Sequence, residues 1–239
     1  MCTVTLIPKK DNNFILTSNR DEAIGRETIS PDFYDEDGVR MLYPRDVVAG
    51  GTWIGIGEFS SLICLLNGGF HRHVRRSDYI KSRGLVVKDL LKFNDLKEGI
   101  ETYNYIGIEP FTIAGVQWKE NLKLYELVWD GEKSHVKDLN RLHNYIWSSS
   151  TLYTQEMKSV RQIWFDEFKK DAELESSSIY QFHKTAGIGD KNIDLVMDRG
   201  YVATTSITQV EKRGKEISMN FHNLSRSYHK KVSFEPTTV

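Results

Sequence analysis

The sequence predicts a single α+β domain over residues 1–239, with β-sheets packed together and helices outside them. Three observations favour this fold class. Strand patterns and helix patterns alternate along the chain in the order strands, helices, strands, helices, strands. A chain of 239 residues is long enough to bury one substantial core. We find no internal repeat and no Pro/Ser-rich linker that would divide the chain.

Strands are predicted where short runs of β-branched and aromatic residues are bounded by polar turns. Apolar residues lie on both faces of the first two, which indicates a sheet covered on both sides. The segment 31–47 mixes acidic and apolar residues and is predicted to be a long loop. In chain order, the predicted strands are 2–7, 14–18, 52–56, 60–66, 111–118, 122–129, a short strand around Val136, 201–210 and 216–221.

Helices are predicted where apolar residues recur at steps of three and four. Residues 79–105 fit one or two helices, broken near Asn94. Residues 157–168 form an apolar stripe typical of an amphipathic helix. Residues 173–183 are predicted to form a further helix.

The charge balance, the cysteine count and the length of the apolar runs exclude several classes of partner and site. The 32 basic and 33 acidic side chains give a net charge of −1, which provides no electrostatic reason to expect nucleic acid or an anionic membrane as a bulk partner. Two cysteines supply neither a disulfide framework nor a metal cluster, and they suit the reducing cytoplasm. No apolar run approaches the ~20 residues that cross a bilayer, and no signal segment opens the chain. We therefore expect a cytoplasmic protein without a metal, a cofactor or an integral membrane segment.

The most informative residue is Cys2, which directly follows Met1. Removal of Met1 would leave a thiol and a free α-amine on one residue. The amine titrates near ~7.7–8.0 and the thiol near ~8.5, so the residue could supply both nucleophile and general base. Cys2 also fits a structural role as a small hydrophobic residue that opens a buried strand.

A hairpin around the turn 9–12 would place the chain start beside a polar cluster. If the paired residues have numbers that sum to about 21, Cys2 lies opposite Asn19, with Arg20 and Asp21 beside it; a slip of one residue changes the facing side chain. A guanidinium would favour the thiolate, and a carboxylate could hold the α-amine. A solvated turn would explain the same polar residues.

A second polar position, Asn67, ends an apolar strand and precedes Gly68. The Asn67 amide could donate to an oxyanion, a contribution worth ~3 kcal/mol to a transition state, while Gly68 lets a substrate approach the backbone. The Asn-Gly pair is equally typical of a plain turn.

These motifs together resemble the NRDE family, whose eukaryotic member is transport and Golgi organisation protein 2. The resemblance rests on Met1-Cys2, on the tetrad 19–22 (Asn-Arg-Asp-Glu), on the block 50–56 (Gly-Gly-Thr-Trp-Ile-Gly-Ile) and on Asn67. A weaker similarity to the family's late threonine-rich strand occurs at 203–206. The family itself resembles the cysteine branch of the N-terminal nucleophile (Ntn) hydrolases, which includes bile salt hydrolases and penicillin V acylases.

The resemblance implies a four-layer αββα sandwich of two antiparallel sheets and an amidase that cleaves a non-peptide C–N bond of a small-molecule amide. It implies Cys2 as the nucleophile, with Arg20 and Asp21 as its neighbours and Asn67 as an oxyanion donor. We assign Asn19, Trp53, Gly68 and Ser149 to substrate binding; Trp53 also fits a core position.

Two departures leave alternatives open. Related sequences carry an asparagine near mid-chain where this one has Ser149, and we find no equivalent of the late arginine of the bile salt branch. A noncatalytic carrier of haem or of a lipid-like ligand on the same scaffold is the second interpretation, and a structural or trafficking adaptor is the third. The basic run 71–76 is predicted to be a solvated loop; the alternative is that it forms the rim of a cleft and attracts an acidic substrate.

Overall fold

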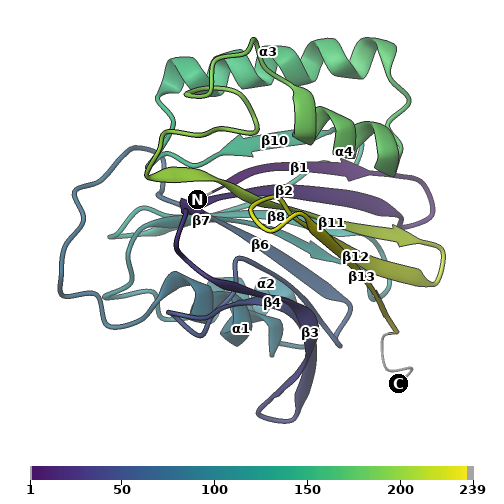
Figure 1. Ribbon diagram of the computed structural model, residues 1–239. Coiled ribbons are helices and arrows are strands. Elements are labelled where there is room, and N and C mark those ends of the chain that lie inside the picture. The colour runs from purple at the N-terminus through teal and green to yellow at the C-terminus, as the bar shows by residue number, and fades with distance from the viewer. Residues whose placement is uncertain (1, 236–239) are drawn as a thin grey trace. The chain divides into compact units, whose positions relative to one another are not determined.

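The computed structural model describes residues 2–235, and for Cys2 it describes the backbone and not the side chain. The chain divides into two compact units. The first combines the chain start up to Arg26 with Leu142–Ser233, and the second comprises Glu27–Arg141 with the end of the chain from Phe234. Each unit contains one sheet and two helices (Figure 1).

The first unit contains a six-stranded sheet in which strands from both ends of the chain lie side by side. Its central pair joins the second strand to the eleventh in an antiparallel register. In spatial order the strands are β10 (Tyr145–Ser148), β1 (Cys2–Pro8), β2 (Phe14–Ala23), β11 (Val202–Arg213), β12 (Glu216–Asn223) and β13 (Tyr228–Phe234).

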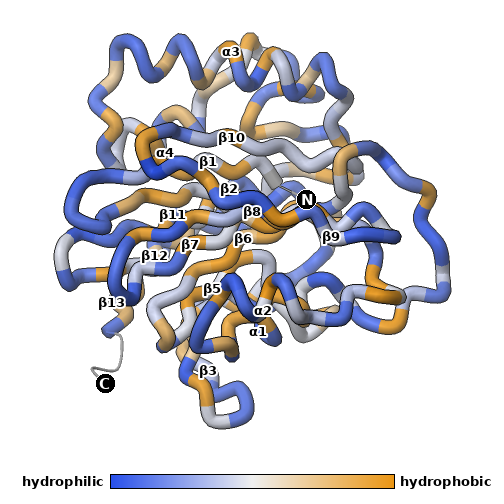
Figure 2. The backbone as a smooth tube through the Cα atoms, turned by 180° about the vertical axis from the view of Figure 1, so that it is seen from behind, coloured by the Kyte–Doolittle hydropathy of each residue, from blue (hydrophilic) through white to orange (hydrophobic). Residues whose placement is uncertain are grey.

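Two helices, α3 (Gln155–Asp171) and α4 (Ser176–Thr185), cover one face of this sheet. The Thr154 hydroxyl accepts a hydrogen bond from the Met157 amide and so caps the start of α3. Apolar and hydrophilic residues alternate along α3 in Figure 2, as expected for a helix with one buried face. The buried cluster beneath the helices consists of Ile7, Ile15, Phe165, Ile179, Phe182 and Leu195.

The second unit contains a seven-stranded antiparallel sheet whose strands follow chain order. Helices α1 (Arg83–Leu91) and α2 (Leu96–Thr102) pack on it, and the Asp95 carboxylate caps α2. The strands are β3 (Thr28–Glu36), β4 (Val39–Asp46), β5 (Ile54–Gly57), β6 (Ser61–Asn67), β7 (Phe111–Gln117), β8 (Lys123–Trp129) and β9 (Ser134–Asp138).

The expected fold class, α+β with two antiparallel sheets, is confirmed, and most predicted elements occur near their expected positions. The long loop predicted over 31–47 is wrong, because these residues form the β3–β4 hairpin. Asp37 and Gly38 both have positive φ in its two-residue turn, and Asp-Gly is a favoured pair for such turns. The acidic residues of β3 conceal the strand pattern, since part of β3 is exposed.

The register of the first hairpin also differs from expectation by one residue. Cys2 pairs with Arg20, not with Asn19, so that paired numbers sum to 22. The turn between the strands contains Asp11 and Asn12 with positive φ, and the Lys9 amide donates to the Asn13 carbonyl. The turn therefore ends one residue later than the sequence indicated.

Candidate functional site

The candidate site begins where β1 starts. The backbone of Cys2 lies directly opposite Arg20 on β2. The sulfur of Cys2 and the residue before it lie outside the described residues, so the expected roles of the thiol and of the α-amine stay predictions. Arg20 is 3% exposed, and its guanidinium donates to the Thr205 hydroxyl at 3.4 Å. Glu22 lies 3.7 Å from the same guanidinium.

Arg20 and Asp21 are neighbours in the sequence but belong to different environments. Successive side chains of a strand point to opposite faces of the sheet. Asp21 accordingly lies on the face covered by α3 and α4, where it contacts residues that Arg20 does not. The two side chains flank the chain start from opposite sides of the sheet and do not act as one ion pair.

The Asp21 carboxylate is fully buried and held by two hydroxyl groups. Tyr153 donates to its Oδ2 at 2.6 Å, and Thr204 of β11 donates to its Oδ1 at 2.7 Å. Burial raises the pKa of Asp21 above its ordinary value, while the charge of Arg161 and the two hydroxyl hydrogen bonds act in the opposite direction. The carboxyl therefore has a fixed orientation but is costly to ionise.

Arg161 of α3 supports the Tyr153 ring that binds Asp21, and it is 1% exposed. Its guanidinium donates to the backbone carbonyls of Ile193 and Asp194 and to the Thr3 hydroxyl at 2.5 Å. The guanidinium carbon lies 3.5 Å from the centre of the Tyr153 ring, a close cation–π contact. These contacts fix the ring whose hydroxyl binds Asp21.

Asn19 lies on the same face and is bonded entirely within the first unit. Its amide nitrogen donates to the carbonyls of His183 and Leu195, and its oxygen lies 2.6 Å from the His183 Nδ1. With this amide orientation Nδ1 carries the proton, and the Thr5 hydroxyl, 2.7 Å from Nε2, donates to that nitrogen. Asn19 thus joins β2 to α4; its expected role in substrate binding stays a prediction.

His183 is fully buried, and its pKa is lowered to about 3, first by burial and then by the charge of Arg161. A neutral ring suits its contacts, because both ring nitrogens already have partners. His183 therefore has a structural place in the polar network behind β2.

Ser149 directly follows β10 in the first unit and is 1% exposed. Its hydroxyl lies 3.0 Å from that of Thr151, and its carbonyl accepts from the amide of Tyr153 at 3.0 Å. Ser149 thus belongs to the turn that carries Tyr153 to Asp21.

The expected residues of the second unit lie around the ends of β5 and β6. Asn67 ends β6 opposite Phe111. Gly68 has φ +89°, its amide donates to the Pro110 carbonyl, and its own carbonyl accepts from Thr112. Trp53, just before β5, is 6% exposed, as a core residue would be.

Sequence reasoning did not assign a role to Tyr153, Arg161 or Thr204. Arg161 interrupts the apolar stripe of α3, and a charged residue at a buried helix position is a signal that could have been used. Thr204 lies in the threonine-rich segment that the resemblance had singled out. Tyr153 lies in a loop, and no sequence pattern around it indicates a role.

The family model described as Transport and Golgi organisation 2 matches residues 1–226 of the chain. The chain belongs to this family. The match spans parts of both compact units and includes the tetrad at Asn19 and the block that starts at Gly50. No curated protein matches the chain.

Among solved structures, this Transport and Golgi organisation 2 family member is similar to three whose names describe an amidase, a hydrolase and an acylase. An N-acylethanolamine-hydrolyzing acid amidase ortholog of Caenorhabditis elegans has a TM-score of 0.60 at 12% identity, covering 87% of this chain and 92% of that one. A variant of conjugated bile acid hydrolase from Clostridium perfringens also scores 0.60 at 12% identity, over 100% and 98%. Penicillin V acylase from Agrobacterium tumefaciens scores 0.58 at 9% identity, over 98% and 86%. At these identities the likeness shows the Ntn-hydrolase fold.

The family's Gly-Gly-Thr-Trp block has a structural explanation in the second unit. A Cβ atom on Gly51 would lie 2.5 Å from the carbonyl carbon of Gly84, at the start of α1. The Thr52 amide donates to the Gly84 carbonyl at 3.1 Å. The absence of a side chain at Gly51 and at Gly84 therefore allows the backbone before β5 to contact the first turn of α1.

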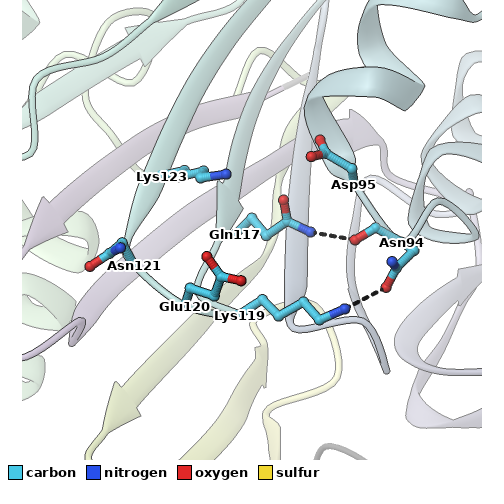
Figure 3. A pocket seen from close by; sticks show the side chains of 7 residues that line it. All are labelled: Asn94, Asp95, Gln117, Lys119, Glu120, Asn121 and Lys123. Atoms are coloured by element: carbon cyan, nitrogen blue, oxygen red, sulfur yellow. Dashed lines mark hydrogen bonds between the residues drawn. The ribbon is translucent and has the colours of Figure 1, made fainter. Parts of the chain in front are cut away.

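A polar cavity of about 220 Å³ lies elsewhere in the second unit (Figure 3). Its polar groups largely bind one another: the Gln117 amide donates to the Asn94 carbonyl, and Lys119 donates to the Asn94 side chain. The residues that line it are Asn94, Asp95, Gln117, Lys119, Glu120, Asn121 and Lys123, and none is a residue expected to act in the site. Within the described residues, no helix combines the length and the apolar character needed to cross a membrane.

Proposed function

We propose that this chain is an amidohydrolase in which Cys2, freed of Met1, attacks the carbonyl carbon of a small-molecule amide. The α-amine of Cys2 takes the thiol proton, and the sulfur forms a C–S bond as the carbonyl oxygen becomes an oxyanion. The amine then passes the proton to the leaving nitrogen, and the C–N bond breaks. Water, activated by the same amine, hydrolyses the thioester and releases the acid.

The observation that carries this proposal is the pairing of Cys2 with Arg20 at the start of β1. A buried guanidinium next to a thiol lowers the cost of forming the thiolate. Arg20 is 3% exposed, so its charge is weakly screened by solvent. The likeness of the fold to amide-cleaving enzymes supports the same reaction class.

Asp21 has the role of holding the α-amine in place. It follows Arg20 on β2, one position beyond the residue that pairs with Cys2, and two hydroxyl donors fix its carboxylate. Asn67 is proposed as a donor to the oxyanion on the family resemblance, and a donor of this kind contributes about 3 kcal/mol to the transition state.

Labelling of Cys2 by an electrophilic amide analogue tests the proposal. The native protein should be labelled at Cys2, and Cys2→Ala should lose the label. Cys64 provides a matched control because its side chain is fully buried, so Cys64→Ala should be labelled like the native protein. Labelling that persists in Cys2→Ala would refute the assignment.

Intact mass tests the condition on which this chemistry depends. Protein isolated from its native host should lack the mass of Met1, because a retained Met1 would block the proposed base. A retained Met1, together with ligand binding that survives Cys2→Ala, would favour the second candidate, a carrier of haem or of a lipid-like ligand.

The observation that favours the carrier is the position of Ser149. Its hydroxyl is buried beside that of Thr151, at the position where related sequences are expected to carry an asparagine. A characteristic visible absorbance band in the purified protein would identify haem, and lipid extraction with mass spectrometry would identify a lipid-like ligand.

A further inference from the structure

The loop between β6 and α1, residues 68–82, concentrates positive charge in a chain that is nearly neutral overall. It contains Arg72, Arg75, Arg76 and Lys81 against a single acidic residue, Asp78. The balanced total of 32 basic and 33 acidic residues conceals this local excess. Charge of this kind acts locally, within a Debye length of about 8–10 Å.

The loop is anchored to the second unit by an ionic cluster at its centre. His73 Nε2 lies 3.0 Å from the Glu109 carboxylate, and Arg83, at the start of α1, binds the same carboxylate at 3.1 Å. The three side chains are between 12% and 16% exposed. The loop is thus held at this point by a shielded cluster.

The residues next to this anchor have largely exposed side chains. Val74 is 88% exposed, and the side chain of Arg75 is 83% exposed. The Arg76 side chain is 62% exposed, lies over the ring of Tyr79 and forms an exposed ion pair with Asp78 at 3.3 Å. Val74, Arg75 and Arg76 thus expose most of their side-chain surface, while Arg75 Nε lies 4.0 Å from the Glu109 carboxylate.

Two further exposed apolar side chains, Ile80 and Ile106, lie on segments that are bonded to each other. The Ile80 amide donates to the Gly107 carbonyl at 3.0 Å, and Lys81 forms a parallel bridge with Ile108. Ile80 is 79% exposed and Ile106 is 73% exposed. The segment that carries Ile106 continues directly to Glu109, the residue that anchors the first part of the loop.

We propose that this surface, named here the arginine–isoleucine surface and made of Arg72, Val74, Arg75, Arg76, Ile80 and Ile106, docks on an anionic lipid bilayer. Val74 and the two isoleucines enter the boundary between headgroups and acyl chains, which removes their apolar area from water. The arginines bind lipid phosphates and carboxylates, and their aliphatic stems remain on the apolar side.

The arrangement favours a bilayer over an acidic protein or an acidic substrate. An acidic substrate would require the guanidinium groups, but it gives no reason for three β-branched aliphatic side chains to stand in water. A protein partner would need pockets shaped for each projecting side chain, whereas a fluid bilayer accepts them without such pockets. The proposal is independent of Cys2 and of the hydrolysis proposed above.

Vesicle flotation with the full chain tests the proposal. The protein should float with vesicles that contain phosphatidylserine and much less with vesicles of phosphatidylcholine alone. Replacing Arg72, Arg75 and Arg76 by glutamine should reduce binding by about fivefold per arginine, since each contributes on the order of 1 kcal/mol near an anionic surface. Raising the salt concentration should weaken binding of the native protein.

Matched variants separate the proposed surface from exposed residues in general. Ile80→Ser with Ile106→Ser should reduce binding, whereas Ile188→Ser, at a residue that is 72% exposed in the first unit, should not. Lys215→Gln, at an exposed lysine of the first unit, should also leave binding unchanged. Cys2→Ala should float like the native protein.

Several results would overturn the proposal. These are no flotation with either vesicle, equal flotation of the arginine variant and the native protein, or binding to polyglutamate that exceeds binding to the anionic vesicles. The last result would identify an acidic polypeptide as the partner.

Discussion

The guanidinium of Arg161 lies against the face of the Tyr153 ring, with 3.5 Å between the guanidinium carbon and the ring centre. Tyr153 in turn donates to the buried carboxylate of Asp21 at 2.6 Å. A charge on α3 is therefore connected through one aromatic ring to the residue next to the chain start. Stability measurements can test each link of this connection.

Tyr153→Phe removes the hydroxyl donor and leaves the ring. Asp21 would lose one of its two hydroxyl hydrogen bonds in a fully buried position, so we expect the free energy of unfolding to fall by about 1–3 kcal/mol. Urea denaturation measures the loss. Tyr201→Phe is the control, because Tyr201 is 71% exposed and should change stability by less than about 0.5 kcal/mol.

Arg161→Lys keeps the charge and removes the planar group. A lysine cannot reproduce bonds to the Ile193 carbonyl, the Asp194 carbonyl and the Thr3 hydroxyl together. We expect a loss on the order of 2–3 kcal/mol, at about 1 kcal/mol for each hydrogen bond. Arg213→Lys, at a side chain that is 68% exposed, should be nearly neutral; an equally small effect at Arg161 would contradict the described contacts.

His183 should make stability depend on pH. Its pKa is about 3 in the folded protein and about 6.5 in an unfolded chain, so the unfolded chain takes up the proton first as pH falls. The stabilisation is complete above pH ~6.5 and declines by about 1.4 kcal/mol per pH unit between there and about 3. His183→Gln should flatten the curve of unfolding free energy against pH in this interval, and an unchanged slope would exclude His183 as its source.

Asp21 should make the free energy of unfolding depend on pH in the opposite direction to His183. Its pKa in the folded protein is raised above the ordinary 3.8, so the folded protein binds the proton first and loses stability as pH rises between the two values. Asp21→Asn removes this dependence. The difference in unfolding free energy between Asp21→Asn and the native protein should therefore rise with pH through that interval and then level off. A difference that falls with pH would show that the carboxylate is stabilised by its surroundings.

Gly51→Ala tests the contact between the Gly-Gly-Thr-Trp block and α1. The new Cβ atom would lie 2.5 Å from the carbonyl carbon of Gly84, and the backbone must separate to admit it. We expect a loss of about 1–3 kcal/mol. Gly25→Ala is the matched control, since a Cβ atom there meets nothing within 4 Å. Thermal denaturation of the two variants should separate them clearly.

The sequence predicts the fold well where pattern and turn chemistry agree, as in the hairpin of β7 and β8 or the helix α3. It fails over 31–47, because the half-exposed strand β3 lacks an alternating pattern, although Asp37-Gly38 signalled the turn. It also misses β10 and β13, which are short or polar strands at the two ends of the six-stranded sheet.

The sequence predicts the part of the candidate site that local pairing brings together and misses the part that long-range contacts form. Local register brings Cys2 to Arg20 within one residue of expectation, because a hairpin determines its own pairing. Tyr153, Arg161 and Thr204 reach Asp21 from separations of 132 to 183 residues or through one another, and no local pattern encodes such contacts.

The pairing of β2 with β11 has a consequence for biosynthesis. The ribosome makes β11 about 180 residues after β2, a delay of roughly 10–40 s at ordinary elongation speeds. Residues 27–141, which form most of the other unit, emerge during this interval and can fold in the meantime. The first strands remain without their central neighbour until the late strand arrives. If Met1 is removed, as the proposed chemistry requires, an aminopeptidase at the tunnel exit would have this interval in which to act before β11 pairs with β2.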